Sequence, residues 1–334
     1  MFNDLIKIIK EKQKFIITTH VNPDGDGLGS EIAFFHLLKS LGKEVYIINQ
    51  DPILENYSFL DPEGDIFVYN RERDHKIFGS SDVLMAIDLS NASRLGVIEK
   101  ELQKNKIYSI CFDHHPPEKK FADLHVVDEN AASIGEMIYE LAKEMGLSMT
   151  KEIATGIYVS ILTDTGSFRY TNTTSKTHQI TAELLKFGIQ PYNIYKDIYE
   201  SNTYQKIVLM GKMLDTLRLD NTGTLGWAVI TKKMMDGLGI GSFDKEGFID
   251  ILRSIKGLEV VILFFEKEEK VIKVSLRSKG NIDVNRIASL FGGGGHRLAS
   301  GAAIEGEGLE LAIQKMLKAT THSIKVFVDS KNNA

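Results

Sequence analysis

The first half of the 334-residue chain alternates short apolar runs with longer amphipathic segments. Five runs are rich in β-branched and aromatic residues and almost continuously hydrophobic, which is typical of strands buried on both faces of a parallel sheet. These runs are residues 15–19, 45–48, 66–69, 83–87 and 108–112. Residues 28–41 between them have helical spacing and are followed by Gly42, a residue that commonly ends a helix. The alternation predicts an α/β domain with a parallel sheet and helices on both faces.

The second half changes its pattern near residue 222. Before that point the spacing is helical, over residues 133–145, 150–162, 174–187 and about 191–218. After it, strand-like runs dominate, followed by helical segments; these cover residues 225–231, 260–266, 271–277, 282–291 and 309–320. The charged segment 267–270 between two of the strands predicts a β-hairpin. We therefore predict an α/β domain over 1–190, a helical connector over 191–220 and a smaller α+β domain over 221–334.

Composition and charge exclude several classes of protein. Hydrophobic residues make up 43% and charged residues 25%, as in ordinary globular proteins. No apolar run approaches the ~20 residues of a membrane span, and the first residues lack the pattern of a signal peptide. The single cysteine, Cys111, excludes an internal disulfide framework and a cysteine-based zinc site. We expect a cytoplasmic protein that does not bind membranes.

The net charge of -5 bears on nucleic acid binding. Proteins that track long nucleic acids usually carry a basic surface, because neutralising phosphates drives that binding. An acidic chain does not fit this pattern. If nucleic acid is a substrate, we expect it to be short and held by a few placed groups.

Candidate chemistry follows the predicted strands, at the edge of the sheet where open α/β folds bind ligands. Carboxylates and imidazoles come directly after the first, fourth and fifth strands and at the end of a later helix. The residues are His20, Asp24, Asp26, Asp88, Asp113, His114, His115 and Asp164. Carboxylates placed so close together repel unless cations neutralise them.

The number and type of these groups point to metal binding. Mixed imidazole and carboxylate ligands suit Mn²⁺, with Mg²⁺, Co²⁺ or Zn²⁺ as further candidates. Six candidate ligands exceed what one ion with an open position needs. They fit a pair of ions about 3.5–4 Å apart, an arrangement that serves phosphoryl transfer.

Two other interpretations of the loop after the first strand fail on spacing. A calcium-binding EF-hand that started at Asp24 would need a ligand at position 28 and a glutamate at 35, but the chain has Leu28 and Phe35. A dinucleotide-binding turn needs a third glycine where the chain has Ser30.

The motifs together resemble a known family. The His20-x-x-x-Asp24-x-Asp26 segment, Asp88, the Asp113-His114-His115 triplet and Asp164 resemble the four motifs of the DHH phosphoesterase superfamily. Further along, GGGGHRLASG over residues 292–301 resembles the glycine-rich motif of the DHH-associated C-terminal domain. The resemblance extends over residues 15–304 and is strongest to the stand-alone nanoRNase/pAp phosphatase branch, called NrnA-like. It implies an active site in a cleft between two domains.

The resemblance also implies roles for individual residues. His20 and Asp24 would bind one metal ion, and Asp26, His114 and Asp164 a second, with Asp88 as a bridge between them. His115 would contact a substrate phosphate and Asp113 would orient its neighbours, so the implied catalytic residues are Asp88, Asp113 and His115. Further substrate contacts are implied for Arg277, Gly293, Gly294, Gly295 and His296, and for Arg94 and Arg169 beside the motifs.

The implied function is hydrolysis of short phosphate esters. Two divalent ions, Mn²⁺ above all, would act on RNA of two to five nucleotides and on adenosine 3',5'-bisphosphate (pAp), with AMP and phosphate as the products of pAp. Two alternatives stay open: a phosphodiesterase for pApA or cyclic dinucleotides, and a non-catalytic nucleotide sensor. A homodimer is compatible with the resemblance.

Overall fold

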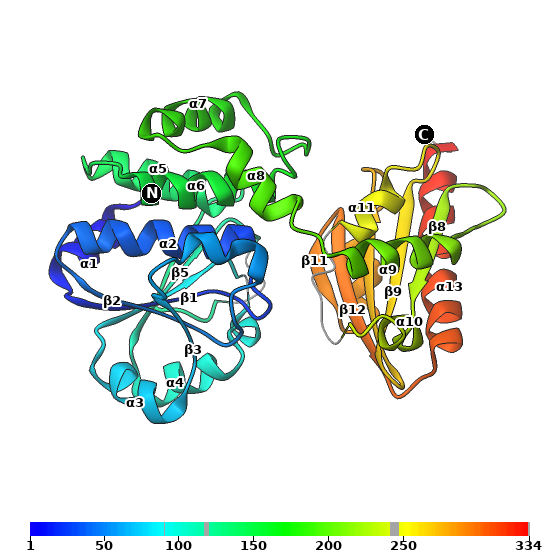
Figure 1. The fold of residues 1–334 in the computed structure, drawn as a ribbon, viewed down its shortest axis with the longest axis horizontal. Helices are drawn as coiled ribbons and strands as arrows, with labels where there is room; N and C mark the ends of the chain where they lie inside the picture. The colour runs from blue at the N-terminus through cyan, green and yellow to red at the C-terminus, as the bar shows by residue number, and fades with distance from the viewer. Residues whose placement is uncertain (90, 117–119, 241–246, 333–334) are drawn as a thin grey trace. The chain divides into compact units, whose positions relative to one another are not determined.

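The computed structural model describes residues 1–89, 91–116, 120–240 and 247–332. The chain divides into two compact units, Met1–Ser201 and Asn202–Ala334. The division falls inside the predicted connector, since helix α8 (Pro191–Tyr199) belongs to the first unit and α9 (Tyr204–Asp215) to the second. Each unit has its own sheet and its own core (Figure 1).

The first unit is built on a six-stranded sheet in the order β3-β2-β1-β4-β5-β6, and all its strand pairs are parallel. The strands are β1 (Lys14–Thr18), β2 (Glu44–Asn49), β3 (Ile66–Val68), β4 (Val83–Ile87), β5 (Tyr108–Asp113) and β6 (Leu124–Val127). The first five confirm the predicted runs. Strand β6 was missed because it has four residues, of which only Val126 is buried.

Helices cover both faces of this sheet, as predicted (Figure 1). On one side lie α1 (Asn3–Glu11), α2 (Gly25–Ser40), α5 (Ile134–Glu144) and α6 (Lys151–Asp164), with α7 (Ser175–Leu184) beyond them. On the other side lie α3 (Arg71–Ser80) and α4 (Val97–Asn105). Alternate residues of β1 separate the two cores, because Phe15 and Ile17 face the first group and Ile16 the second.

Helices α2 and α6 meet backbone to backbone. A Cβ added at Gly29 would lie 2.5 Å from the carbonyl oxygen of Gly156, and one added at Gly156 would lie 2.4 Å from that of Gly29. A side chain at either position would therefore push the helices apart. This contact fixes the distance between the two helices that carry Asp26 and Asp164.

The second unit has a mixed sheet in the order β11-β12-β10-β9-β8-β7. Its strands are β7 (Arg218–Leu219), β8 (Leu225–Ile230), β9 (Val260–Glu268), β10 (Val271–Ser278), β11 (Gly294–His296) and β12 (Ala299–Glu305). Among the described strands of this sheet, only β8 and β9 pair in parallel. The predicted β9–β10 hairpin is confirmed. Strands β7, β11 and β12 were not predicted. Strand β7 has two residues and begins where the predicted helical spacing of 191–218 ends, and the glycine and alanine of β11 and β12 disfavour strands.

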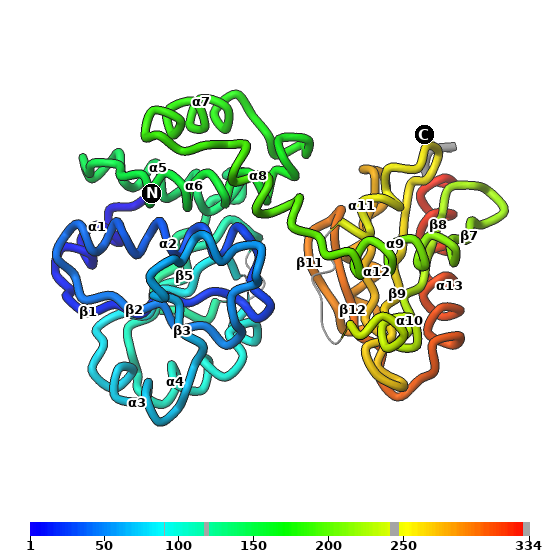
Figure 2. Tube along the Cα trace, viewed as in Figure 1, coloured from blue at the N-terminus to red at the C-terminus, as the bar shows by residue number. Residues whose placement is uncertain are grey.

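Helices also lie on both faces of the second sheet, as the chain trace shows (Figure 2). One face packs on α9, α10 (Lys232–Asp236) and α11 (Phe248–Arg253), and the other on α12 (Val284–Ser289) and α13 (Leu309–Asn332). In β9, Val261 and Leu263 face the first group, and Ile262 faces the second.

No helix in the part of the chain that the structure describes is long and apolar enough to cross a membrane.

The contact between α2 and α6 yields a stability prediction. Gly29→Ala should destabilise the protein by about 1–3 kcal/mol, because the added methyl group meets backbone that cannot move without separating the helices. Gly79→Ala in α3 is the matched control, since its Cβ would meet only Asn105 Oδ1, at 3.7 Å. Alanine also favours a helix over glycine, so the control should be neutral or stabilising. Denaturant unfolding followed by circular dichroism measures both; equal stability of the two variants would contradict the account.

Candidate metal centre

The sheet order places the motif residues side by side. Strands β1, β4 and β5 are neighbours, and their carboxyl ends lie at one edge of the sheet. His20 follows β1, Asp88 follows β4, and Asp113 ends β5. Asp24 caps α2 and Asp164 is the last residue of α6. The predicted metal ligands of the first unit therefore come together from five elements.

Local geometry at the start of α2 orients the two aspartates of the first motif. The Asp24 side chain accepts hydrogen bonds from the backbone N–H groups of Asp26 and Gly27, both at 3.1 Å, as an N-cap residue does. A Cβ at Gly27 would lie 2.5 Å from Thr19 Oγ1, so only glycine lets the helix start this close to β1. Asp26 is buried, whereas Asp24 is exposed.

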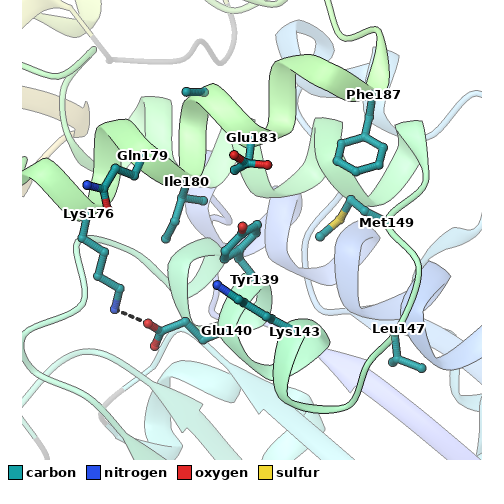
Figure 3. Close-up of a pocket in the computed structure, with 11 residues that line it drawn as sticks. Tyr139, Glu140, Lys143, Leu147, Met149, Lys176, Gln179, Ile180, Glu183 and Phe187 are labelled. Carbon is teal, nitrogen blue, oxygen red and sulfur yellow. Dashed lines mark ion pairs between the residues drawn. The ribbon is translucent and has the colours of Figure 1, made fainter.

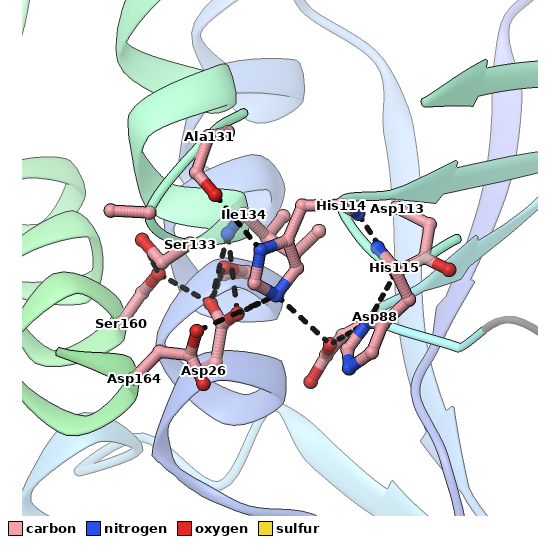
Figure 4. Close-up of polar contacts among 12 residues, drawn as sticks. Asp26, Asp88, Asp113, His114, His115, Ala131, Ser133, Ile134, Ser160 and Asp164 are labelled. Carbon is pink, nitrogen blue, oxygen red and sulfur yellow. Dashed lines mark hydrogen bonds and ion pairs between the residues drawn. The ribbon is translucent and has the colours of Figure 1, made fainter. Parts of the chain in front are cut away.

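Two groups of ligand atoms share Asp88. In the first, His20 Nε2 lies 3.6 Å from Asp24 Oδ2 and 3.4 Å from Asp88 Oδ2. In the second, His114 Nε2 lies 3.4 Å from Asp26 Oδ2, 3.6 Å from Asp164 Oδ2 and 3.9 Å from Asp88 Oδ1 (Figure 4). The two carboxylate oxygens of Asp88 thus face different groups. Each group has nitrogen and oxygen donors close enough to hold a metal ion.

The chemistry of Asp88 fits divalent cations. Its carboxylate is 3% exposed, and Oδ1 accepts no hydrogen bond from any described residue. A buried carboxylate oxygen without a donor is costly unless a cation neutralises it. The residue also has a left-handed backbone, with φ of 62°, which aspartate tolerates better than most side chains. This backbone turns the side chain toward both groups.

The protonation of the histidines shows how strongly the site attracts positive charge. Burial alone would lower the pKa of His20, but Asp24 and Asp88 outweigh burial and raise this pKa to about 10. Burial likewise works against His114, whose pKa is nevertheless raised to about 9 by Asp164, Asp26 and Asp88. Divalent ions would have to displace these protons, since metal-bound imidazole is neutral.

The pKa values of the aspartates also show that charged groups are close together in this site. Burial raises the pKa of Asp164 to about 6, and the charge of Asp88 adds to the effect. Burial and then Asp88 also raise the pKa of Asp26 well above its usual value. These carboxylates therefore resist ionisation together in the absence of added positive charge, which is the behaviour expected of an assembled metal-binding cluster.

The remaining residues of the DHH triplet, Asp113 and His115, contact each other beside the cluster, and His115 Nδ1 also lies 3.4 Å from Asp88 Oδ1. Asp113 Oδ1 lies 2.8 Å from His115 Nδ1 and also accepts from the backbone N–H of His114. Burial lowers the pKa of His115, but the bond to Asp113 outweighs it, so the pKa is raised. The pair fixes the orientation of the His115 ring (Figure 4).

Three contacts to Asp26 were not foreseen in the sequence. Asp26 Oδ1 accepts from Ser30 Oγ at 3.2 Å, Ser160 Oγ at 2.5 Å and the backbone N–H of Ile134 at 3.2 Å. The sequence does contain the helical spacing behind two of these contacts. Ser30 lies one turn after Asp26, and Ser160 lies one turn before Asp164. Single hydroxyl groups at such spacing are too common to stand out without the fold.

The two arginines beside the motifs have different surroundings. Arg94 lies in the 3₁₀ turn η2 (Ala92–Leu95). Burial alone would raise the pKa of Asp24, but His20, Gly27 and Arg94 outweigh burial, so this pKa lies below its usual value. Arg169 is exposed; its Nε donates to the Gly166 carbonyl oxygen at 2.6 Å. Arg94 therefore acts on the ligand cluster electrostatically, and the contact seen for Arg169 is with its own loop.

The second unit aligns its predicted residues across three strands. Arg277 on β10 pairs with Ala299 on β12, and Ala299 pairs with His296 on β11. Directly opposite residues of antiparallel strands point to the same face, so Arg277 and His296 share a face with a small residue between them. We call Arg277, Ala299 and His296 the basic strip.

The glycine run is a turn followed by a strand. Gly292 has a left-handed backbone, whereas Gly294–His296 forms β11 at the edge of the sheet. A Cβ at Gly293 would lie 2.1 Å from the Gly301 carbonyl oxygen, and one at Gly295 would lie 2.7 Å from that of Ala299. Close packing on β12 thus requires glycine at both positions.

A surface hollow of about 840 Å³ lies elsewhere in the first unit (Figure 3). Its lining comes mainly from α5 and α7 and includes the ion pair between Lys176 Nζ and Glu140 Oε1, at 2.7 Å. None of the clustered aspartates and histidines lines it. The candidate metal centre at the sheet edge is therefore separate from this hollow.

Comparison with known proteins agrees with this arrangement. Residues 14–161 match the DHH family, N-terminal domain, and residues 240–325 match the DHHA1 domain. The chain is 34% identical to the bifunctional oligoribonuclease and PAP phosphatase NrnA of Thermus thermophilus, over 92% of this chain and 89% of the relative. It is 30% identical to the Bacillus subtilis protein of the same name, over 91% and 93%.

A solved structure shows the same fold along the whole chain. An exopolyphosphatase-related protein from Bacteroides fragilis superposes with a TM-score of 0.91 at 28% identity, covering 98% of this chain and 97% of that one. Together with the sequence matches and the clustered motif residues, this places the chain in the DHH phosphoesterase family, as an NrnA-like member with a DHH and a DHHA1 domain.

Proposed function

We propose that this protein is a two-metal phosphoesterase that hydrolyses RNA of two to five nucleotides to mononucleotides and pAp to AMP and phosphate. The observation that carries the proposal is Asp88, whose two oxygens face two separate groups of ligand atoms. The substrates are suggested by relatives named as bifunctional oligoribonucleases and PAP phosphatases, which match over most of both chains.

In this proposal His20, Asp24 and Asp88 would hold one ion, and Asp26, His114 and Asp164 would hold the other, with Asp88 between them. A third group of potential ligand atoms, from Asp88, His114 and His115, overlaps these two. When bound, two divalent ions such as Mn²⁺ would supply an activated water and positive charge for the phosphoryl group. The open side of the cluster is formed by Asp24, the exposed member of the set.

The chain's own residues would bind and orient the phosphate. The pKa of His115 is raised, so the imidazolium persists to higher pH than for an ordinary histidine. Its Nδ1 lies 2.8 Å from Asp113 Oδ1, which fixes the ring, and in this proposal the imidazolium contacts a phosphate oxygen. Arg94 adds positive charge near Asp24. Such groups stabilise the charge that develops during phosphoryl transfer.

We further propose that the basic strip of the second unit binds a phosphate of the substrate. A guanidinium fork suits phosphate, and the strip has a small residue, Ala299, between its two larger side chains. A site with few cationic groups on a chain of net charge -5 favours a short substrate over a long one.

The metal assignment is tested by Asp88→Asn. Asparagine keeps the shape of the side chain and tolerates the left-handed backbone, so the variant removes charge and little else. We expect at least ~100-fold lower turnover and weaker binding of both ions, because one ligand serves both. Metal analysis and steady-state kinetics measure this. Asp82→Asn is the control, since Asp82 accepts from Gln13 and Lys14 at the other end of the sheet. Near wild-type turnover in Asp88→Asn would refute the shared-ligand assignment.

The substrate class is tested with 5'-labelled RNA of two to twenty-four nucleotides, pAp, pApA, cyclic dinucleotides and pyrophosphate in the presence of Mn²⁺. We expect the rate to fall as RNA lengthens beyond about five nucleotides, because the acidic chain cannot track a long backbone. Mononucleotide release resolved by gel or chromatography gives the rates. Equal rates on two and twenty-four nucleotides would overturn the proposed substrate class, and cleavage of pApA or cyclic dinucleotides alone would favour a dinucleotide phosphodiesterase.

The basic strip is tested by His296→Ala and Arg277→Ala. Both variants should bind two ions but cleave a dinucleotide at least tenfold more slowly, about 1.4 kcal/mol, because a charged contact to phosphate is lost. A generic aryl phosphodiester, which has no second phosphate, should be much less affected. Arg286→Ala is the control, as its side chain is 88% exposed and pairs with Asp283. If both substrates were cleaved more slowly by the same factor, the strip would act in the chemical step and not in substrate binding. If neither rate changed, the strip would have a structural role.

A further inference from the structure

The two carboxylate oxygens of Asp26 have different surroundings. Oδ1 accepts hydrogen bonds from Ser160, Ser30 and the N–H of Ile134. Oδ2 lies 3.4 Å from His114 Nε2, and from the described residues it accepts one hydrogen bond, shared with Oδ1, from the Ile134 N–H at 3.2 Å. One oxygen is therefore held by the protein, and the other is directed at the ligand group of His114 and Asp164 (Figure 4).

Ser160 makes the shortest of these contacts, and its own position is fixed. Its hydroxyl donates to Asp26 Oδ1 at 2.5 Å and accepts from the backbone N–H of Gly135 at 2.7 Å. A Cβ at Gly135 would lie 2.5 Å from Ser160 Oγ, so glycine at the start of α5 is what lets the two groups approach. Ser160 is fully buried, so its hydroxyl is not exposed to bulk solvent.

Helix packing brings this hydroxyl to the aspartate. Gly156, Ser160 and Asp164 follow one another at intervals of one turn on the same face of α6. Gly156 makes the backbone contact with Gly29 of α2, and Asp164 reaches the ligand cluster. Ser160 lies between them, opposite Asp26. The close approach of α2 and α6 therefore also brings the Ser160 hydroxyl to Asp26 at the candidate metal centre.

We propose that Ser160 is a positioning residue that holds Asp26 as a one-oxygen ligand, through Oδ2, for the ion bound with His114 and Asp164. This inference rests on the proposed two-metal site. A carboxylate locked at one oxygen cannot rotate to offer both oxygens to the ion, and it presents the remaining oxygen in a fixed direction. Partners of this kind, which contact a ligand and not the metal, typically change metal affinity by about 10–100-fold when removed.

The test is Ser160→Ala, with Mn²⁺ binding to the full-length protein measured by calorimetry and by the electron paramagnetic resonance signal of free Mn²⁺. We expect one of the two ions to bind at least ~10-fold more weakly and the other to bind as in the wild type. The selective loss distinguishes positioning from general damage to the fold. Thermal unfolding of the metal-free variant checks that alanine, a good helix former, leaves the helix intact.

Ser133→Ala is the matched control. Ser133 is equally buried, and its hydroxyl lies 3.0 Å from Ser160 Oγ, but within the described part of the chain this hydroxyl makes no hydrogen bond to Asp26. We expect less than a ~3-fold change in the binding of either ion, since a hydroxyl that does not touch the ligand has little hold on it. Should Ser160→Ala not fold, Ser160→Cys replaces the hydroxyl with a weaker donor and should weaken the same ion by an intermediate amount.

The outcomes separate this inference from the proposed function. If the wild type binds fewer than two ions, the two-metal site itself is wrong. If the wild type binds two ions and Ser160→Ala, or Ser160→Cys in its place, binds both unchanged, Ser160 has no positioning role. Equal weakening of both ions, or equal effects of Ser160→Ala and Ser133→Ala, would also overturn the assignment, because neither pattern is selective for the ligand that Ser160 contacts.

Discussion

The repulsion among buried carboxylates is the constraint on which the rest of this protein depends. Asp26, Asp88 and Asp164 approach one another at the end of the sheet, in surroundings that raise the pKa of Asp26 and Asp164. The same field raises the pKa of His20 and His114. A protein folds around such a cluster at a cost in free energy, and cations relieve that cost. The arrangement is therefore one that binding of divalent ions would stabilise.

The fold assembles this cluster with rigid backbone elements. Neighbouring parallel strands bring three motifs to one sheet edge, and the contact between Gly29 and Gly156 sets the distance between the helices that carry two further ligands. Asp88 is oriented by a left-handed backbone, and Asp26 by hydroxyl groups and a helix N-terminus. These backbone contacts and hydroxyl groups would not bind a metal ion themselves. In the proposed mechanism, each positions an oxygen or nitrogen atom that would do so.

Much of this could be predicted from sequence because it follows a simple period or a fixed spacing. The five apolar runs became strands, and the order of the motifs after them placed Asp88 and the DHH triplet at one edge. The bridging role of Asp88 was implied by resemblance alone; the two directions of its oxygens give that role a geometric basis.

The remaining features could not be predicted, because they depend on contacts between residues that are far apart in the sequence. Ser160 contacts Asp26 across 134 residues of sequence, and a lone serine in a helix carries no pattern. Strands β11 and β12 are rich in glycine and alanine, so the basic strip could not be foreseen as a strand register. The resemblance implied substrate contacts for the glycine run; the structure shows that packing on β12 requires glycine at positions 293 and 295.

The central claim is that two ions share Asp88, and anomalous diffraction at the manganese edge from crystals grown with Mn²⁺ tests it most directly. We predict two peaks about 3.5–4 Å apart, one beside His20 and Asp24, the other beside Asp26, His114 and Asp164, and both in contact with the Asp88 carboxylate. A single peak at full occupancy, or two peaks of which only one contacts Asp88, would contradict the account.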